Sequence, residues 1–448
     1  MLAILVLSFL LRAFLVFSGG QDYWPDESRY GRSRLAAKVL WAGDIAGSLC
    51  VLNKADHFLF MVVGVIPATL EMVVGPNPEV PALFFSFFSV ASLWLLWGVM
   101  RRVGESERVA LFAVALLALC STSLYYSRHL LPYDTAMAFG LLALFVGLRT
   151  PLRAVDSIVC GLLAACAFLT YNGYWTLAAF AILAQALRPP RTLRQCLRRA
   201  LLSGASFAAP CAALLGASSL AGGNLLRQLI AFSRGVTQGS YGEGWSLPFA
   251  YLWHAEHLLV VLWAVAMVYA LREVALGSRN EALLLGISGV LWTYGCLVVV
   301  SVVLGRMVVY GRLARQLVPF FCIVTALFLE RVRSSAPRGK ALVGIVSALA
   351  ACQAVVNFHR PLTQVFPLEF RRMAAVAATV AGPGKYEVLF AEFIYPVPPA
   401  VSTDGRTILE RPHPLEFLPF QYEGWTPDER SAIRASDIRM RLVRRDRQ

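Results

Sequence analysis

The chain has 448 residues, of which 58% are hydrophobic and 15% are charged, and its mean hydropathy is +0.61. Soluble domains carry about 25% charged residues, so this composition excludes a soluble globular protein and indicates a protein of the lipid bilayer. The formal net charge of +14 could suggest binding to nucleic acid. The basic residues, however, form short clusters between apolar runs, as in cytoplasmic membrane loops, and we expect no nucleic-acid partner.

The nine cysteines are scattered, mostly within apolar runs, and form no C-x-x-C pattern. This spacing argues against a disulfide framework or a structural zinc site. The apolar N-terminus resembles a signal peptide, but no small-residue cleavage site precedes Gly19 and further spans follow, so we expect a retained first helix. The absence of N-x-S/T acceptor sites favours a bacterial inner membrane.

A membrane crossing needs about 17 to 25 apolar residues. Eleven apolar segments are candidate crossings, one of them (173–187) shorter than this range: 1–17, 80–100, 108–127, 133–149, 155–171, 173–187, 200–221, 249–271, 282–304, 314–331 and 341–357. The basic loops between them are expected to face the cytoplasm, which puts the N-terminus inside and residues 18–79 outside. Both flanks of residues 153–188 are basic, so two short helices around the Asn-Gly turn at 172–173 are predicted there.

The stretch 58–74 is apolar but short, with Pro67 inside and Glu71 near its end. For these reasons we predict an interfacial or re-entrant helix. A spanning helix would reverse the orientation of everything upstream. A second helix of about sixteen residues should precede it and end at Gly43. The first external loop, 18–79, is therefore predicted to hold juxtamembrane helices.

The composition changes to polar after Asn357, with proline, glycine and mixed charge. A small extracytoplasmic α/β domain is predicted over 358–448, following the transmembrane domain of 1–357. Its expected elements are helices at 370–381 and 427–435 and strands at 387–393 and 438–443.

Adjacent carboxylates, Asp26 and Glu27, stand where the chain leaves the first span. In one interpretation they only stabilise a helix, with Asp26 as its cap and Glu27 complementing its dipole. In the other, a carboxylate at the membrane surface beside Arg29 and Arg32 is a base that takes a proton from a hydroxyl. Asp134, at an external junction between two spans, has the same two interpretations.

Four motifs follow one another along the chain: P-D-E-S-R-Y at 25–30, A-D-H-F-L at 55–59, Y-S-R-H-L-L-P-Y-D at 126–134 and R-L-A-R-Q-L-V-P at 312–319. This order resembles the GT-C fold glycosyltransferases, in the polyprenyl-phosphate-sugar branch (glycosyltransferase family 39 type) that includes protein O-mannosyltransferases and the lipid A aminoarabinose transferase. The resemblance covers residues 1–150 and 305–330, while the middle matches only in hydropathy.

The resemblance implies an all-α polytopic GT-C fold and sugar transfer from a polyprenyl-phosphate carrier. By motif match, Asp26 is the expected catalytic base, Glu27 its neighbour in the site and Asp134 the second acidic group. The chain departs from many relatives at 54–57 and at 170–172, positions near the donor site, so no particular sugar or acceptor carries over.

The leaving group in such a reaction is a lipid phosphate, whose growing negative charge a guanidinium can bind through two parallel hydrogen bonds. The candidate phosphate-binding residues, with the first the strongest, are Arg315, Arg312, Arg306, Arg128 and Lys54. The alternatives are that these side chains extend to lipid headgroups or belong to structural ion pairs.

Two histidines, His254 and His257, flank Glu256 at the outer start of a span and are weak candidates for a divalent metal. No D-x-D motif occurs, and the cofactor stays unknown. Outer-loop aromatic residues such as Tyr126 and Tyr133 are expected to form an interfacial belt. The glycine-rich connection at 222–248 is long enough to act as a lid. Tyr241 and Trp245 lie in this connection and are the substrate-loop candidates, because their rings could stack on a sugar.

The sequence therefore predicts an inverting glycosyltransferase of the inner membrane, with an acceptor glycan, lipid or protein at the outer face. The first alternative is a transporter or flippase of a lipid-linked sugar, for which charges within spans and broken helices would be the indication. Arg12 is the one clear charge within a predicted span. The second alternative is a membrane assembly partner without catalytic activity.

Overall fold

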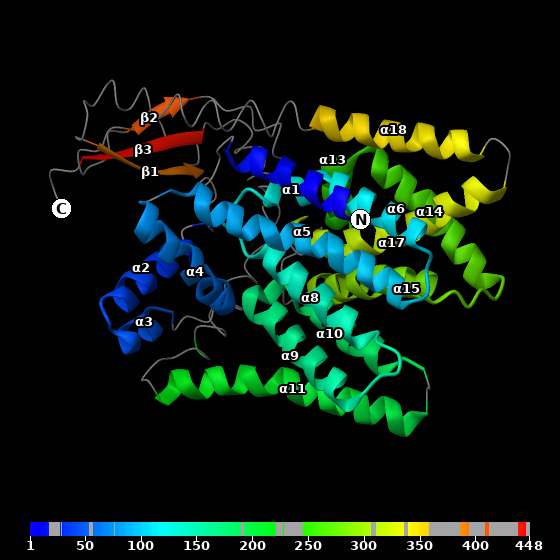
Figure 1. Cartoon of the computed structure of the whole chain (residues 1–448), viewed down its shortest axis with the longest axis horizontal. Helices are drawn as coiled ribbons and strands as arrows, with labels where there is room; N and C mark the ends of the chain where they lie inside the picture. The colour runs from blue at the N-terminus through cyan, green and yellow to red at the C-terminus, as the bar shows by residue number, and fades with distance from the viewer. Residues whose placement is uncertain are drawn as a thin grey trace.

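A computed structural model describes residues 1–17, 27, 29–52, 57–75, 77–189, 192–220, 227, 245–305, 311–335 and 339–357, and the backbone of strands at 386–393, 408–411 and 438–444. The described part of the first 357 residues is almost entirely helical (Figure 1). It contains a helix at each of the predicted spans.

The helices, in chain order, are α1 (Leu2–Phe17), α2 (Tyr30–Trp41), α3 (Ile45–Leu52), α4 (Phe58–Val74), α5 (Glu79–Arg102), α6 (Glu107–Leu119), α7 (Ser121–Tyr126), α8 (Tyr133–Gly147), α9 (Ala154–Thr170), α10 (Trp175–Ala186), α11 (Leu193–Leu220), α13 (Leu247–Glu256), α14 (Leu258–Ala275), α15 (Glu281–Val298), α16 (Gly311–Ala314), α17 (Val318–Ser335) and α18 (Gly339–Asn357). Within the described ranges, five helical segments are long and apolar enough to cross a membrane. They are 79–102, 193–220, 258–275, 281–303 and 312–335.

The predicted pair of short helices around the Asn-Gly turn is present. α9 ends at Thr170, a 3₁₀ turn, η2 (Asn172–Tyr174), follows, and α10 begins at Trp175. The predicted continuous spans 108–127 and 249–271 are wrong, because each is broken. Cys120 is extended (φ −62°, ψ 126°) between α6 and α7, and His257 (φ 40°, ψ −106°) separates α13 from α14.

The helices of the first external loop pack on one another through a buried acid. Glu71 of α4 accepts hydrogen bonds from the Tyr30 hydroxyl (2.8 Å) and from Arg34 Nη2 (2.9 Å), both on α2. α2 begins at Tyr30, later than predicted, and ends before Gly43, whose φ of +86° favours glycine. α4 has the predicted bounds. Figure 1 shows α2, α3 and α4 grouped beside the N-terminal end of α5.

The centre of the bundle consists of α8 and α17, most of whose side chains are buried by the neighbouring helices. Small residues let the helices approach closely, as is common in membrane proteins. Gly161 of α9 faces the backbone of α11 so tightly that an added Cβ would lie 2.1 Å from the Ser203 carbonyl oxygen. The α9–α11 contact therefore depends on the absence of a side chain at this position.

The described part of the tail is a three-stranded antiparallel sheet in the order β1-β3-β2, with β1 (Tyr386–Phe393), β2 (Ile408–Arg411) and β3 (Ile438–Arg444). β1 and β3 overlap the two predicted strands, whereas the four-residue β2 was not predicted. The helices expected at 370–381 and 427–435 lie outside the described residues. The division into two domains stays a prediction.

Replacing Gly161 by alanine is expected to destabilise the fold, because the new methyl group meets the α11 backbone rather than a movable side chain. The cost should be about 1 to 3 kcal/mol, typical of overpacking in a core. Thermal unfolding in detergent measures it. Gly216→Ala, on α11 with nothing within 4 Å of the added Cβ, is the control. Equal melting temperatures for the two variants would contradict the tight contact.

Candidate functional site

Two residues far apart in the sequence, Asp134 and Arg315, form a buried ion pair. Arg315 Nη2 lies 2.5 Å from Asp134 Oδ1, and the side chains are 4% and 7% exposed. Asp134 stands in the first turn of α8, and Arg315 opens a 3₁₀ turn, η4 (Arg315–Leu317), directly before α17. The carboxylate thus binds a cation, and Pro132 occupies the N-cap position of α8. The capping interpretation of Asp134 is wrong.

Tyrosine rings lie against the arginines of this pair. The Arg315 guanidinium lies 4.6 Å from the centre of the Tyr126 ring, and that of Arg312 lies 5.9 Å from the Tyr133 ring. The two tyrosines contact each other edge to face at 5.2 Å. Both are at most 3% exposed, so the expected interfacial belt is wrong for them. They hold the guanidinium planes through cation–π contacts instead.

Glu27 connects the first external loop to the segment before α8. Its Oε1 accepts a hydrogen bond from the Leu130 amide at 2.6 Å and lies 3.3 Å from His129 Nδ1. Burial, together with the neighbouring charge of Arg128, holds the pKa of His129 well below its usual range. His129 is therefore neutral, and its contact with Glu27 is not an ion pair. The P-D-E-S-R-Y and Y-S-R-H-L-L-P-Y-D motifs thus meet in space.

The structure brings only part of the predicted site together. Asp26, Lys54, Arg306 and Tyr241 lie outside the described residues, as does the side chain of His254. Arg128 is fully buried beside His129, with its Nε 3.4 Å from His129 Nε2. Trp245 is 59% exposed, and its carbonyl accepts a hydrogen bond from the Tyr294 hydroxyl at 2.7 Å.

One residue from each of the two segments that differ from the resembled pattern, 54–57 and 170–172, takes part in a single ring contact. The rings of His57 and Tyr171 stack with centroids 5.1 Å apart. Tyr171 also contacts Tyr133, whose ring supports Arg312, at 5.0 Å. Tyr126 and Tyr133 form a tyrosine layer against the arginines of the site, and His57 and Tyr171 extend this layer. The sequence alone did not show this contact.

Glu256 is a buried acid that the sequence did not single out as a site residue. Its carboxylate accepts hydrogen bonds from the amides of Ser121 and Thr122 (both 2.8 Å) and from the Thr122 hydroxyl (2.7 Å), and so caps α7 from α13. This external cap explains why α6 and α7 separate at Cys120. Within the described residues, no three His, Cys, Asp or Glu side chains form a possible metal site.

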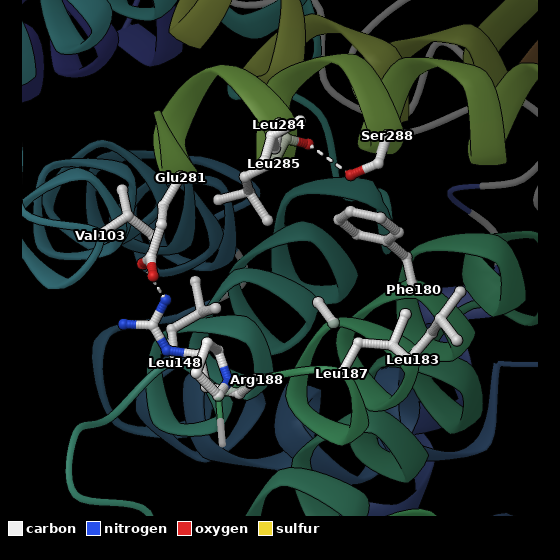
Figure 2. Close-up of a pocket in the computed structure, with 12 residues that line it drawn as sticks. Val103, Leu148, Phe180, Leu183, Leu187, Arg188, Glu281, Leu284, Leu285 and Ser288 are labelled. Atoms are coloured by element: carbon white, nitrogen blue, oxygen red, sulfur yellow. Dashed lines mark hydrogen bonds and ion pairs between the residues drawn. The ribbon is translucent and has the colours of Figure 1, made fainter. Parts of the chain in front are cut away.

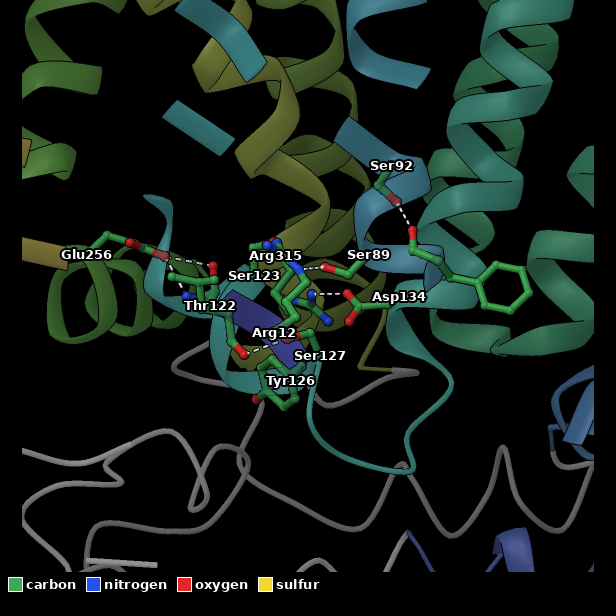
Figure 3. Close-up of polar contacts among 12 residues, drawn as sticks. Arg12, Ser89, Ser92, Thr122, Ser123, Tyr126, Ser127, Asp134, Glu256 and Arg315 are labelled. Atoms are coloured by element: carbon green, nitrogen blue, oxygen red, sulfur yellow. Dashed lines mark hydrogen bonds and ion pairs between the residues drawn. The ribbon is translucent and has the colours of Figure 1, made fainter. Parts of the chain in front are cut away.

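Arg12 of α1 is fully buried and lies in the same cluster as Asp134 and Arg315 (Figure 3). Its guanidinium donates to Ser89 Oγ (2.9 Å), to the Ser8 carbonyl (3.2 Å) and to Ser123 Oγ (3.0 Å). These bonds join α1, α5 and α7. The sequence signal was a charge within an apolar span, but its polar partners became apparent only in the structure.

Figure 2 shows a separate cavity of about 170 Å³. It is lined by Leu148, at the opposite end of α8 from Asp134, and by the Arg188–Glu281 ion pair. Fourteen helical residues at about 1.5 Å each place it about 20 Å from the Asp134–Arg315 pair. The cavity is therefore distinct from the candidate site.

No protein-family model matches the chain, and no curated protein sequence matches it. Among solved structures it is similar to ArnT from Cupriavidus metallidurans, in the apo state and bound to undecaprenyl phosphate, with a TM-score of 0.57 and 14% identity over 85% of this chain and 69% of ArnT. The chain has the GT-C fold. The fold expected from the four motifs is thereby confirmed.

A second similar structure is that of the oligosaccharyltransferase from Archaeoglobus fulgidus, with a TM-score of 0.46 and 12% identity over 82% of this chain and 55% of the archaeal chain. ArnT and this enzyme are both GT-C glycosyltransferases. At 14% identity the similarity to ArnT establishes the fold alone.

Breaking the buried ion pair is expected to be costly. Asp134→Asn leaves Arg315 as a buried cation without its carboxylate and should lower the free energy of unfolding by about 3 to 5 kcal/mol. The control is Arg333→Gln, which removes the partly exposed pair with Glu330 and should cost less than about 1 kcal/mol. Chemical unfolding in detergent distinguishes the two, and similar losses would contradict a structural role for the buried pair.

Glu256 is expected to make stability depend on pH. Burial raises its pKa from the ordinary 4.5 to about 7, although the hydrogen bonds from Ser121 and Thr122 act in the opposite direction. The folded state therefore binds the proton more tightly than the unfolded chain, and the resulting stability, complete below pH 4.5, is lost as the pH rises through about 7.

The melting temperature of the wild-type protein should consequently fall between about pH 5 and about pH 8, and Glu256→Gln should flatten this dependence. Glu107→Gln, at an exposed position in the first turn of α6, should keep the wild-type slope. Parallel curves for wild type and Glu256→Gln would show that Glu256 is not the titrating group.

Proposed function

We propose that the protein is an integral membrane glycosyltransferase that moves a sugar from a polyprenyl-phosphate donor to an acceptor at the extracytoplasmic face. The Asp134–Arg315 pair carries the proposal, because it places a buried carboxylate and a guanidinium side by side within a GT-C fold. Glu27, adjacent in sequence to Asp26, is anchored on the same segment that leads to Asp134. ArnT, which shares the fold, has been solved bound to undecaprenyl phosphate, and this supports a lipid-linked donor.

The proposed reaction is a single displacement. Asp26 removes the proton from the acceptor hydroxyl, the acceptor oxygen attacks the anomeric carbon, and the bond from that carbon to the phosphate oxygen breaks. The departing lipid phosphate takes up the negative charge and moves toward Arg315, with Arg312 and Arg306 as its neighbours. Attack from the face opposite the leaving group inverts the anomeric configuration.

The remaining candidates have supporting roles in this proposal. Lys54 and Arg128 add positive charge on the donor side, and Tyr241 and Trp245 contribute aromatic surface to a loop that covers the sugar. Burial of the tyrosine layer excludes water around Arg315, which strengthens its attraction for a phosphate. A dry site also protects the donor from hydrolysis.

Transport of a lipid-linked sugar is the second candidate, because two observations favour it. The α6–α7 and α13–α14 breaks and the buried Arg12 are features that transporters also use. Transport would move the intact donor between leaflets, whereas the glycosyltransferase releases free polyprenyl phosphate. The two functions therefore differ in their products.

The test is reconstitution of the full chain in liposomes with radiolabelled undecaprenyl-phosphate hexoses and pentoses and a cell-envelope extract as acceptor. The wild type should release undecaprenyl phosphate, and Asp26→Asn should slow this release by at least about 100-fold while expression is unchanged. Asp44→Asn, an exposed carboxylate in the same loop that accepts from the Gly47 amide, should stay within about twofold of wild type.

Normal turnover by Asp26→Asn would remove the base assignment. Movement of intact donor across the membrane, with no glycosidic product from any sugar, would replace the proposed enzyme by the transporter. Replacement of both Asp26 and Asp134 without any change in phenotype would favour the silent assembly partner.

A further inference from the structure

Arg12 is an ionised side chain within an otherwise apolar helix. It is fully buried, and it lies five residues before the end of α1 at Phe17, which is about 8 Å along the helix. A charge inside a membrane-spanning segment is costly and usually serves a function. The proposed reaction does not use Arg12.

The hydrogen bonds of Arg12 satisfy its donors without neutralising its charge. All three acceptors, the Ser8 carbonyl and the hydroxyls of Ser89 and Ser123, are neutral oxygens. The buried carboxylate of Glu71, by contrast, pairs directly with an opposite charge, that of Arg34. The positive charge of Arg12 therefore acts on its surroundings at longer range.

Those surroundings are the candidate site. The charges of Asp134 and Arg315 both act on the Arg12 guanidinium, and Figure 3 shows the three side chains in one cluster. Among these three side chains alone, two guanidinium groups share the carboxylate of Asp134, which leaves one net positive charge. Glu256, the other carboxylate labelled there, has a pKa of about 7 and adds only part of a negative charge near neutral pH.

A free donor accompanies this excess charge. Arg315 uses Nη2 to bind Asp134, whereas its buried Nη1 has no hydrogen-bond partner among the described residues. A buried donor without an acceptor is costly unless a ligand supplies one. An anionic oxygen would offset the excess positive charge and would also accept a hydrogen bond from Arg315 Nη1.

We propose that Arg12 is a positioning residue that balances the charge of Asp134, so that Arg315 keeps a free positive charge for the phosphate of a polyprenyl-phosphate lipid. Arg12 itself does not touch the lipid, and its bonds to α5 and α7 hold it beside the pair. Without Arg12, Asp134 would neutralise Arg315 and the site would attract the phosphate less strongly. This inference rests on the proposed function.

The experiment measures binding of undecaprenyl phosphate to the full chain in lipid nanodiscs. Arg12→Met should weaken binding by about tenfold or more, the effect of one charge in a site of low dielectric constant. Arg102→Gln, which removes one positive charge at the opposite end of α5, should bind within about twofold of wild type. Thermal unfolding of each variant reports whether it is folded.

Two further variants distinguish an electrostatic role of Arg12 from a purely structural one. Arg12→Lys keeps the charge but not the bonding geometry of the guanidinium, and it should bind nearly as tightly as wild type. In the double variant Arg12→Met with Asp134→Asn, Arg315 is again the uncompensated cation, and binding should recover relative to Arg12→Met alone. A purely structural role for Arg12 predicts no recovery.

The outcomes are distinct. If the wild type binds undecaprenyl phosphate and folded Arg12→Met binds it equally well, the role of Arg12 is refuted and the proposed function stands. Loss of binding in folded Arg12→Lys, or no recovery in the double variant, also refutes it. If the wild type itself binds no undecaprenyl phosphate, the proposed function fails and the inference falls with it.

Discussion

The buried pair between Asp134 and Arg315 is the interaction on which the site depends. It joins the start of α8 to the turn before α17, and these are the two helices at the centre of the bundle. In a dry interior each charge would be very unfavourable alone, so the pair constrains both helices at once. The tyrosine layer and the docking of Glu27 next to α8 are both built around this constraint.

A second constraint is that a polar group inside the bundle is costly unless it has a hydrogen-bond partner. Arg12 obtains its acceptors from three helices, and Glu256 obtains its donors from the start of α7. The break between α6 and α7 supplies free amides for Glu256, because the first amides of a helix have no partner within it. The helix break therefore supplies the donors that the buried Glu256 needs, and Glu256 supplies the acceptor that the free amides need.

The sequence predicted the parts of this protein that depend on local pattern. Apolar runs placed a helix at each expected span, the Asn-Gly turn placed the α9–α10 junction, and the alternation in the tail placed β1 and β3. Motif order indicated the GT-C fold. It also selected Asp134 and Arg315, but as separate site residues and not as a pair.

What the sequence by itself determined was thus membrane residence, the positions of the helices and the residue types able to handle a phosphate and a proton. Only the tertiary structure decided that Asp134 pairs with Arg315, that Glu256 caps α7, and that Arg12 joins the same cluster. Hydropathy reports each residue's affinity for lipid or water. It does not report which distant side chain satisfies a buried charge, because such partners are fixed by helix packing, and α8 and α17 lie far apart along the chain.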